Sequence, residues 1–244
     1  MIEVRQLTTQ PEFVDAVRLQ KTIWGFEDVE LLPVRLFVVA SKIGGHVFGA
    51  YDAGRMIGFC LAIPGLKPGG KYYLHSHMLG VLPEYRNGGV GRMLKLAQRT
   101  ESLARDIPLL EWTFDPLEIK NAYFNMQRLG AVVRRYVLNQ YGTTSSHLHG
   151  GLPTDRCVAE WWLSSSRVEA ILAGTPFNGG PIQARIAVPA DIAEIRVSNS
   201  ARAREIQQRV SDQFLEYFAK GLAVIAFERT ADAGTYLLGK WEST

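Results

Sequence analysis

The sequence predicts an α/β (α+β) protein in which a mixed sheet is flanked by helices, followed by a small C-terminal α/β unit. Apolar runs with a two-residue period alternate with segments of helical apolar spacing, in the order β-α-α-β-β-β-α-β-α-β-β up to about residue 163. Glycine and proline clusters separate most of these segments. With 244 residues, of which 47% are hydrophobic, the chain can bury a core without disulfides or metal ions.

The overall charge and the cysteine content exclude several classes of protein. The 27 Lys and Arg residues against 24 Asp and Glu give a net charge of +3, too small a bias to indicate nucleic-acid or anionic-membrane binding. Cys60 and Cys157 form no C-x-x-C motif and predict no disulfide framework. Glu3 and Arg5 lie where a signal peptide would be apolar, and no apolar run approaches the roughly 18 residues of a membrane span. We expect a soluble, cytoplasmic protein.

Each predicted element rests on the spacing of its apolar side chains and on the turn residues that bound it. Strands are predicted where apolar residues alternate, at 1–7, 46–51, 55–63, 71–82, 108–114, 131–141 and 157–163. Helices are predicted from Pro11 to Gly25, at 31–43, at 91–105 and from Asp115 to Gly130. The segment 64–70 holds two prolines and three glycines and is predicted to be a loop.

Two of these helices are predicted in more detail. The helix after the strand at 108–114 would have Asp115 as its N-cap, Pro116 at its first position and Glu118 three residues after the cap. The helix at 91–105 would bury an apolar stripe made of Met93, Leu96, Ala97, Thr100, Leu103 and Ala104.

The composition also predicts a division into domains. Residues 1–163 would form one domain, 164–181 a linker containing the glycine-rich GTPFNGGP, and 182–244 a small α/β domain. The last segment begins, like the chain itself, with a strand, a proline-led helix and two β-like runs, which favours a degenerate half-repeat. About 64 residues form only a marginal core alone, so we expect this domain to pack near residues 158–163. The alternative is an independent module on a flexible tether.

The most specific motif is a glycine-rich segment that joins the strand at 71–82 to the helix at 91–105. Arg86, Gly89 and Gly91 fit the pattern R-x-x-G-x-G. Backbone N–H groups at such a helix start bind anions, and Arg86 and Arg92 add positive charge for phosphates. The segment lacks the Walker pattern G-x-x-x-x-G-K-[ST] and the spacing of a dinucleotide fingerprint. A glycine-rich turn without a ligand is the remaining alternative.

The strand, loop, helix, strand and helix around this motif resemble the GCN5-related N-acetyltransferase (GNAT) superfamily. The resemblance covers about residues 1–163: the segment 78–86 is similar to the family's fourth strand and its exit, and 115–131 is more loosely similar to its second conserved block. The resemblance implies a GNAT-type mixed twisted sheet and acetyl-CoA as co-substrate, without a metal.

The resemblance also implies where acetyl-CoA would bind. It would lie in a V between the strands at 74–81 and 109–114, with its pantetheine paired to the first strand and its pyrophosphate on the N–H groups of 87–92. The residues implied to bind it are Leu79, Gly80, Val81, Arg86, Asn87, Gly88, Gly89, Val90, Gly91, Arg92, Asn121 and Phe124.

Two histidines on the implied pantetheine strand are candidate general bases. His75 and His77 share a face because the strand period is two, and His75 stands 11 positions before Arg86, where many GNAT enzymes carry a glutamate base. The His-x-His spacing resembles the serotonin N-acetyltransferase branch. We interpret His75 as the base, assisted by His77. The alternatives are histidines hydrogen-bonded into a polar face, or a zinc pair, which would need a third ligand from elsewhere, such as His147 or His149.

The acid that would protonate the leaving thiolate is harder to assign. The family usually places a tyrosine four residues before the glycine that ends the second helix, and Met126 occupies that position here. Tyr123 lies one turn earlier on nearly the same face and is our candidate, although it could instead pack in the core. The CoA thiolate could also leave unprotonated, because a thiol pKa is about 8.5.

The sequence thus predicts an acetyl-CoA-dependent N-acetyltransferase in which an amine attacks the thioester directly. The alternative is a GNAT-fold regulatory module that binds acyl-CoA or CoA without turnover. A small-molecule or peptide amine is the expected acceptor, with no nucleic-acid or membrane partner, and a homodimer is compatible with the sequence.

Overall fold

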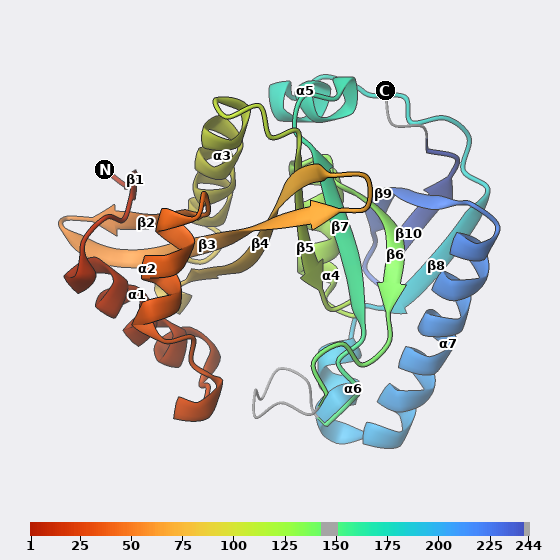
Figure 1. Cartoon of the computed structure of the whole chain (residues 1–244). Coiled ribbons are helices and arrows are strands. Elements are labelled where there is room, and N and C mark those ends of the chain that lie inside the picture. Colours follow the sequence, from red (N-terminus) through yellow and green to blue (C-terminus); the bar gives the residue numbers. More distant parts are fainter. Residues whose placement is uncertain (143–150, 242–244) are drawn as a thin grey trace. The chain divides into compact units, whose positions relative to one another are not determined.

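The computed structural model describes residues 1–142 and 151–241, which group into two compact units (Figure 1). The first unit is Met1–Glu111, and the second comprises residues 112–142 and 151–241. Strand β5 (Leu109–Phe114) contributes residues to both. Strands and helices occur throughout both units, so the predicted α/β class is confirmed.

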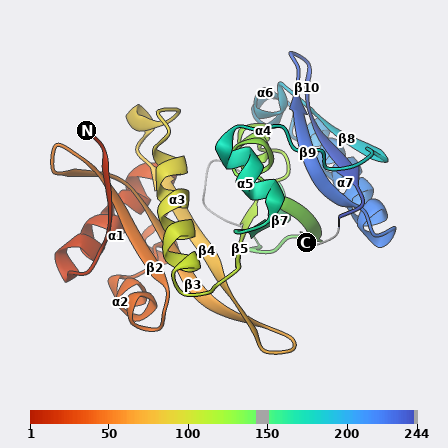
Figure 2. The same cartoon turned by 90° about the horizontal axis from the view of Figure 1, so that it is seen from above.

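The first unit is a sheet with helices on both faces. Its strands are β1 (Glu3–Gln6), β2 (His46–Asp52), β3 (Arg55–Lys67) and β4 (Lys71–Val81), antiparallel neighbours in that order, with β5 parallel to β4. Its helices are α1 (Gln10–Trp24), α2 (Val34–Lys42) and α3 (Val90–Leu103), with short 3-10 turns at Asp28–Glu30 and Pro83–Tyr85. Figure 2 shows α3 on one side of β2, β3 and β4, and α1 and α2 on the other.

Each face of this sheet has its own apolar core. Phe13 of α1, Phe37 of α2 and Phe59 of β3 belong to one buried cluster. Leu94 of α3 and Cys60 of β3 belong to the other. The two-residue period of β3 thus supplies both cores from one strand.

The buried face of α3 differs from the predicted one. The expected stripe is only half-buried or exposed, and the residues in the interior are Val90, Leu94, Lys95, Gln98 and Ser102. The prediction was wrong because it assumed that only apolar side chains would face the sheet. Polar side chains can be buried where they find hydrogen-bond partners, as Lys95 and Gln98 do with Ser76 of β4.

The predicted loop at 64–70 is mostly strand. β3 continues to Lys67 and stays paired with β4, with Pro64 opposite Leu74. The ladder between β3 and β2 ends at Ala62, opposite His46. Beyond that pair β3 is an edge strand on the β2 side, where a proline that lacks an N–H group is tolerated.

The second unit contains the remaining strands in the order β5-β7-β6-β9-β10-β8. They are β6 (Val132–Val137), β7 (Arg156–Trp162), β8 (Ala184–Pro189), β9 (Ala223–Arg229) and β10 (Ala233–Gly239). The helices are α4 (Ile119–Tyr123), a π-helix (Phe124–Arg128), α5 (Ser166–Ala173), α6 (Ile192–Ser198) and α7 (Ser200–Ala219).

Asp115 does not begin the helix predicted to follow it. The helix starts at Ile119, and the Asp115 Oδ1 accepts a hydrogen bond from the Leu117 N–H at 2.8 Å within the preceding turn. The Oδ2 of Asp115 lies 2.7 Å from the Arg196 Nη2, and both side chains are buried. Asp115 therefore anchors α6 to the start of α4, a long-range role that local capping rules do not capture.

The structure groups the chain differently from the predicted division at 164–181. That segment contains helix α5, and β9 pairs with β6 through Val224 and Val133. The C-terminal elements β8, α6, α7, β9 and β10 follow the order of β1, α1, α2, β2 and β3. The pairing differs, because β1 joins the first hairpin strand, β2, whereas β8 joins the second, β10. The order of elements is thus repeated without the topology.

Removing the C-terminal elements should destabilise the second unit. Tyr136 of β6 stacks on Phe214 at 5.2 Å between ring centroids, and the Ser211 hydroxyl donates to the buried Asp155 at 2.7 Å. A fragment of residues 1–178 loses these partners and exposes the edge of β6. We expect it to be insoluble, or to melt well below the full chain by circular dichroism. A soluble fragment with unchanged melting would contradict this packing.

No helix among residues 1–142 and 151–241 combines the length and the apolar character that a bilayer crossing requires.

Candidate functional site

The glycine-rich loop connects β4 to α3 in the first unit, as predicted. Asn87 and Gly89 both have left-handed backbone conformations, with φ of 65° and 85°. Gly89 is the N-cap of α3, and a Cβ added there would meet no atom within 4 Å. The Met93 N–H donates to the Gly89 carbonyl, so the N–H groups of Val90 and Gly91 precede this first turn of the helix. Asn87, Gly88 and Gly89 are exposed, which leaves these donors accessible to an anion.

Arg86 and Gly80 link this loop to the end of α1. The guanidinium of Arg86 donates to the carbonyls of Val81 at 3.3 Å and Ile23 at 3.4 Å. A Cβ at Gly80 would lie 2.7 Å from the Trp24 ring, so only glycine fits this close approach. Direct contact of Arg86 with a phosphate stays a prediction.

Strand β4 contains a β-bulge at the candidate bases. Leu61 of β3 lies opposite Met78. The next β3 residue, Ala62, lies opposite Ser76, so His77 is the extra residue of the bulge.

One edge of β4 is only partly paired. Its ladder with β5 consists of Leu74 opposite Leu110 and His75 opposite Glu111. Within the first unit, residues 76–81 have no further partner strand on that edge among the described residues. Backbone groups on an unpaired edge can accept an added extended chain.

The predicted common face of His75 and His77 is confirmed. Their ring centroids lie 5.8 Å apart, and both residues are half-buried. Ser76 between them bonds to α3, so the histidines occupy the opposite face. Burial lowers the pKa of His77, which keeps this imidazole neutral at pH 7 and able to accept a proton.

Glu111 brings a carboxylate next to His75 in the register of β4 and β5. Glu111 is buried and forms an ion pair with Lys67, which lies near the end of β3. The ion pair offsets part of the cost of burying this carboxylate. The strand partner of the candidate base is thus an acidic residue.

A buried polar network joins α3 to β4 beneath the histidines. The Lys95 Nζ donates to the Ser76 Oγ at 2.8 Å, and the Ser76 Oγ donates to the Gln98 Oε1 at 2.9 Å. All three residues are buried. Because Lys95 lies one turn into the helix that begins at the loop, the network ties the phosphate loop to the strand of the candidate bases.

Lys95 should make stability depend on pH. Burial lowers its pKa from 10.5 to about 7, so between these values the unfolded chain binds a proton that the folded chain does not. The free energy of unfolding therefore rises with pH across this window. In Lys95→Met this rise should be smaller by a few kcal/mol, because a pKa shift of this size corresponds to about that much free energy. Urea midpoints measured at several pH values test this.

The control for that experiment is Lys71→Met. Lys71 is exposed at the start of β4, so its replacement should leave the pH dependence unchanged. If the urea midpoint rises equally with pH in the wild type and in Lys95→Met, the pKa of Lys95 is not lowered in the folded protein.

The other predicted site residues lie in the second unit. Tyr123 ends α4 with 36% of its surface exposed, and the Arg229 guanidinium carbon lies 5.7 Å from its ring centroid. Asn121 is exposed, Phe124 is half-buried and Met126 is fully buried. Tyr123 is therefore not a core residue. The π-helix that follows it is a rare form that is frequently found at functional sites.

A metal site and a surface hollow are the remaining candidates for a functional site. Within residues 1–142 and 151–241, no cluster of three or more His, Cys, Asp or Glu side chains is suited to a metal ion. His147 and His149 lie outside these described residues.

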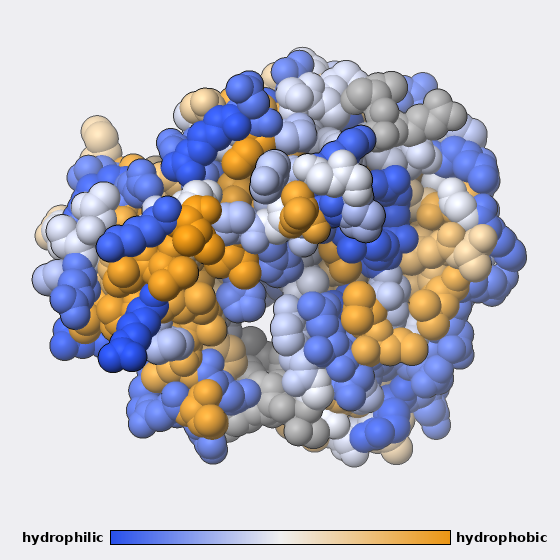
Figure 3. Space-filling model, in the orientation of Figure 1, coloured by the Kyte–Doolittle hydropathy of each residue, from blue (hydrophilic) through white to orange (hydrophobic). Residues whose placement is uncertain are grey.

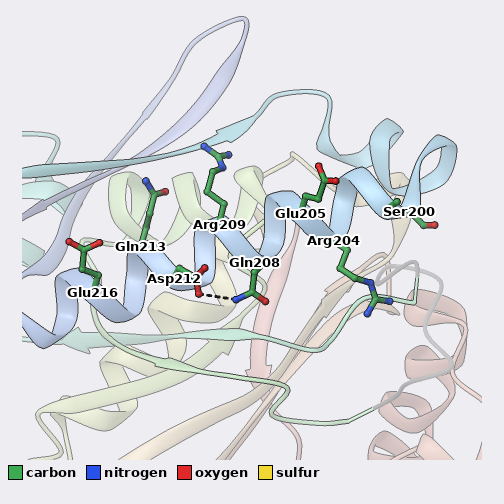
Figure 4. A pocket seen from close by; sticks show the side chains of 9 residues that line it. Ser200, Arg204, Glu205, Gln208, Arg209, Asp212, Gln213 and Glu216 are labelled. Carbon is green, nitrogen blue, oxygen red and sulfur yellow. Dashed lines mark hydrogen bonds between the residues drawn. The ribbon is translucent and has the colours of Figure 1, made fainter.

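A hollow of about 900 Å³ follows the polar face of α7, where Arg204, Glu205 and Asp212 are among its lining residues (Figure 4). All of its lining residues come from this helix, which indicates an open, solvated surface.

Sequence reasoning missed Glu111 and the buried network of Lys95. Signals for both were present. Glu111 is the single charged residue of the apolar strand Leu109–Phe114, and Lys95, Gln98 and Ser102 recur at helical spacing as a polar stripe.

Comparisons with known proteins agree with this arrangement. The family model described as Acetyltransferase (GNAT) family matches residues 12–116. A search of curated proteins finds no match. The ribosomal-protein-S18-alanine N-acetyltransferase from Escherichia coli is 17% identical, with a TM-score of 0.52 over 68% of this chain and 96% of that one. Arabidopsis thaliana Naa50, in complex with the bisubstrate analogue CoA-Ac-MVNAL, is 14% identical, with a TM-score of 0.51 over 65% and 97%.

A third solved structure is the GNAT-family acetyltransferase from Streptococcus pneumoniae, which is 13% identical with a TM-score of 0.53 over 66% of this chain and 98% of that one. At such identities these likenesses concern the fold. The family model covers β2, β3, β4, the glycine-rich loop and α3. Residues 12–116 of this chain thus match the GNAT acetyltransferase family model, and the fold is similar to that of the solved structures above.

Proposed function

We propose that this protein transfers the acetyl group of acetyl-CoA to an amine, by direct attack of the amine on the thioester. The observation that carries the proposal is the combination, in one unit, of an exposed glycine-rich helix start, a partly unpaired strand edge and a histidine pair. These features supply, respectively, an anion site, a place for an extended ligand and a proton acceptor.

Acetyl-CoA would lie along β4. Its pantetheine would pair with the backbone of Leu79, Gly80 and Val81, and its pyrophosphate would bind the N–H groups of 87–92. The half-buried Arg92 and the exposed Arg86 add positive charge at the loop. Asn121 and Phe124 are proposed as further residues that contact CoA.

The reaction needs a proton acceptor and a proton donor. The amine nitrogen forms a bond to the thioester carbonyl carbon, its proton passes to His75 directly or through His77, and the carbon–sulfur bond breaks. Tyr123 is the proposed donor to the leaving sulfur. Since Met126 is fully buried at the family's usual tyrosine position, departure as thiolate is the alternative.

We expect residues 24–45 to contact the acceptor, because α1 and α2 cover the face of β4 that carries the histidines (Figure 2). Figure 3 shows hydrophobic side chains gathered over the first unit, on the side where α2 lies in Figure 1. Val39 and Ile43 are exposed on and just after α2. An amine attached to a partly apolar body fits such a surface. Peptide amines belong in the test panel, since the structure of Naa50 contains a peptide-like analogue.

Release of free thiol from acetyl-CoA tests the proposal. The assay would use a panel of small amines and peptides, with the acetylated product identified by mass spectrometry. We expect amine-dependent thiol release that follows saturation in both substrates. The absence of turnover with every amine, despite CoA binding, would overturn the proposal.

That outcome would favour a second function, a regulatory module that binds acyl-CoA without turnover. The buried Met126 is the observation that supports it, because this residue cannot donate a proton. Binding measured by calorimetry without turnover would identify it.

A further inference from the structure

Another hollow lies entirely within the second unit, and none of the residues assigned above is among its lining residues. It has a volume of about 520 Å³ and lies between α5, the glycine-rich segment 174–180, the π-helix and β9. Its lining includes Arg167 and no aspartate or glutamate. This unit holds a positive charge inside a partly apolar hollow.

Arg167 is buried, with 4% of its surface exposed, and its bonding leaves one arm of the guanidinium unused. Its Nε donates to the Gly130 carbonyl at 2.9 Å, and its Nη2 donates to the Met126 carbonyl at 3.4 Å. Its guanidinium carbon lies 5.6 Å from the centroid of the Phe177 ring. Among the described residues, Nη1 has no hydrogen-bond partner, and no carboxylate lies within ion-pair distance of Arg167.

The two carbonyls do not neutralise this charge. They lie at the C-terminal end of the helical segment that runs from α4 through the π-helix, whose dipole supplies about half an elementary charge. Buried charges in proteins are usually paired with an opposite charge. Burial lowers the pKa of Arg167 to about 10, which agrees with an incompletely compensated cation that remains protonated at pH 7.

The unused Nη1 faces the glycine-rich segment. A Cβ added to Gly179 would lie 3.7 Å from the Arg167 Nη1 and 3.7 Å from Ile225. The backbone of Gly179 is not in the left-handed region, so a side chain fits there without strain. Space for a group bonded to Nη1 is therefore present.

We propose that this hollow binds a small organic anion, with a carboxylate or phosphate on the Arg167 guanidinium and an apolar body against Ile171, Phe177 and Ile182. A free guanidinium arm recognises both kinds of oxyanion. The apolar side chains and the volume favour a ligand larger than an inorganic ion.

The test uses the full-length chain with benzoate and phenyl phosphate as probes at constant ionic strength, and chloride as the reference ion. We expect the melting temperature to rise by about 3 °C at tenfold above the Kd, since the ligand binds only the folded state. No rise with either probe would overturn the proposal.

Two matched variants place the effect at this site without removing Arg167. Gly179→Asp puts a tethered carboxylate beside Nη1, so this variant should melt higher than Gly179→Asn without any probe and should no longer respond to the probes. Gly179→Asn adds a side chain of the same size without charge and should respond like the wild type. An equal response of the Asp and Asn variants would show that the anions bind elsewhere, for example at the loop of α3, and would also overturn the proposal.

Discussion

Replacing His75 by alanine is expected to lower kcat by about 10²–10⁴-fold, with little change in the affinity for CoA. This range is typical for the loss of a general base. His75 lies on the face of β4 opposite α3 with its ring centroid 5.8 Å from that of His77, and its side chain is not part of the apolar cores. The loss should therefore appear in turnover rather than in folding. Steady-state kinetics and CoA calorimetry on the same preparation measure the two effects separately.

The pH profile of the His75 variant gives an independent readout. In the wild type, kcat/KM should fall on the acidic side as the base becomes protonated, and this acidic limb should weaken in His75→Ala. His75→Gln is the matched control, because it keeps a polar side chain that cannot titrate in this range, and it should behave like alanine. Unchanged activity and an unchanged profile in His75→Ala and in the double variant with His77→Ala would remove both histidines from the mechanism.

The second large effect is expected at Gly89, where a glutamate should weaken CoA binding by on the order of 100-fold or more. A carboxylate at this helix start would occupy the proposed pyrophosphate site and repel its charge. The position is open, with no atom within 4 Å of an added Cβ, so the side chain itself meets no steric barrier. Calorimetry with CoA, and the shift in melting temperature that CoA produces, measure the loss.

Gly89→Gln separates charge from backbone strain. Gly89 has φ of 85°, where any side chain costs roughly 1–2 kcal/mol, and both variants pay this equally. The glutamine variant should therefore be destabilised to the same extent yet bind CoA more tightly than the glutamate variant. Equal CoA affinities in the two variants would mean that the pyrophosphate does not lie at this loop.

The parts of the site that the sequence predicts are those governed by local geometry. The two-residue period of a strand is enough to place His75 and His77 on one face. A run of glycines between a strand and a helix is enough to predict an exposed helix start at Gly89. Both inferences depend on neighbours in the sequence alone, and both geometries are present in the structure.

The parts that the sequence did not predict depend on partners far along the chain. Lys95 is buried because Ser76, 19 residues earlier, accepts its hydrogen bond, and no local pattern contains that information. Asp115 resembles a helix cap in sequence but is committed to Arg196, 81 residues later. Pro64 resembles a loop residue, although β4 holds it in a strand. In each case a tertiary contact overrides the local preference.

The bulge at His77 has a consequence for how this strand tolerates insertion and deletion. An extra residue in a regular strand inverts the orientation of every side chain beyond it. Here the bulge absorbs the extra residue, so Ser76 still bonds to α3 and Met78 still packs in the core below α1 and α2. Shortening the strand by His77 alone would therefore restore a continuous ladder with β3 and leave both flanking faces as they are. The second imidazole of the pair occupies a position that the sheet does not need, which leaves that position open to change without disturbing the fold.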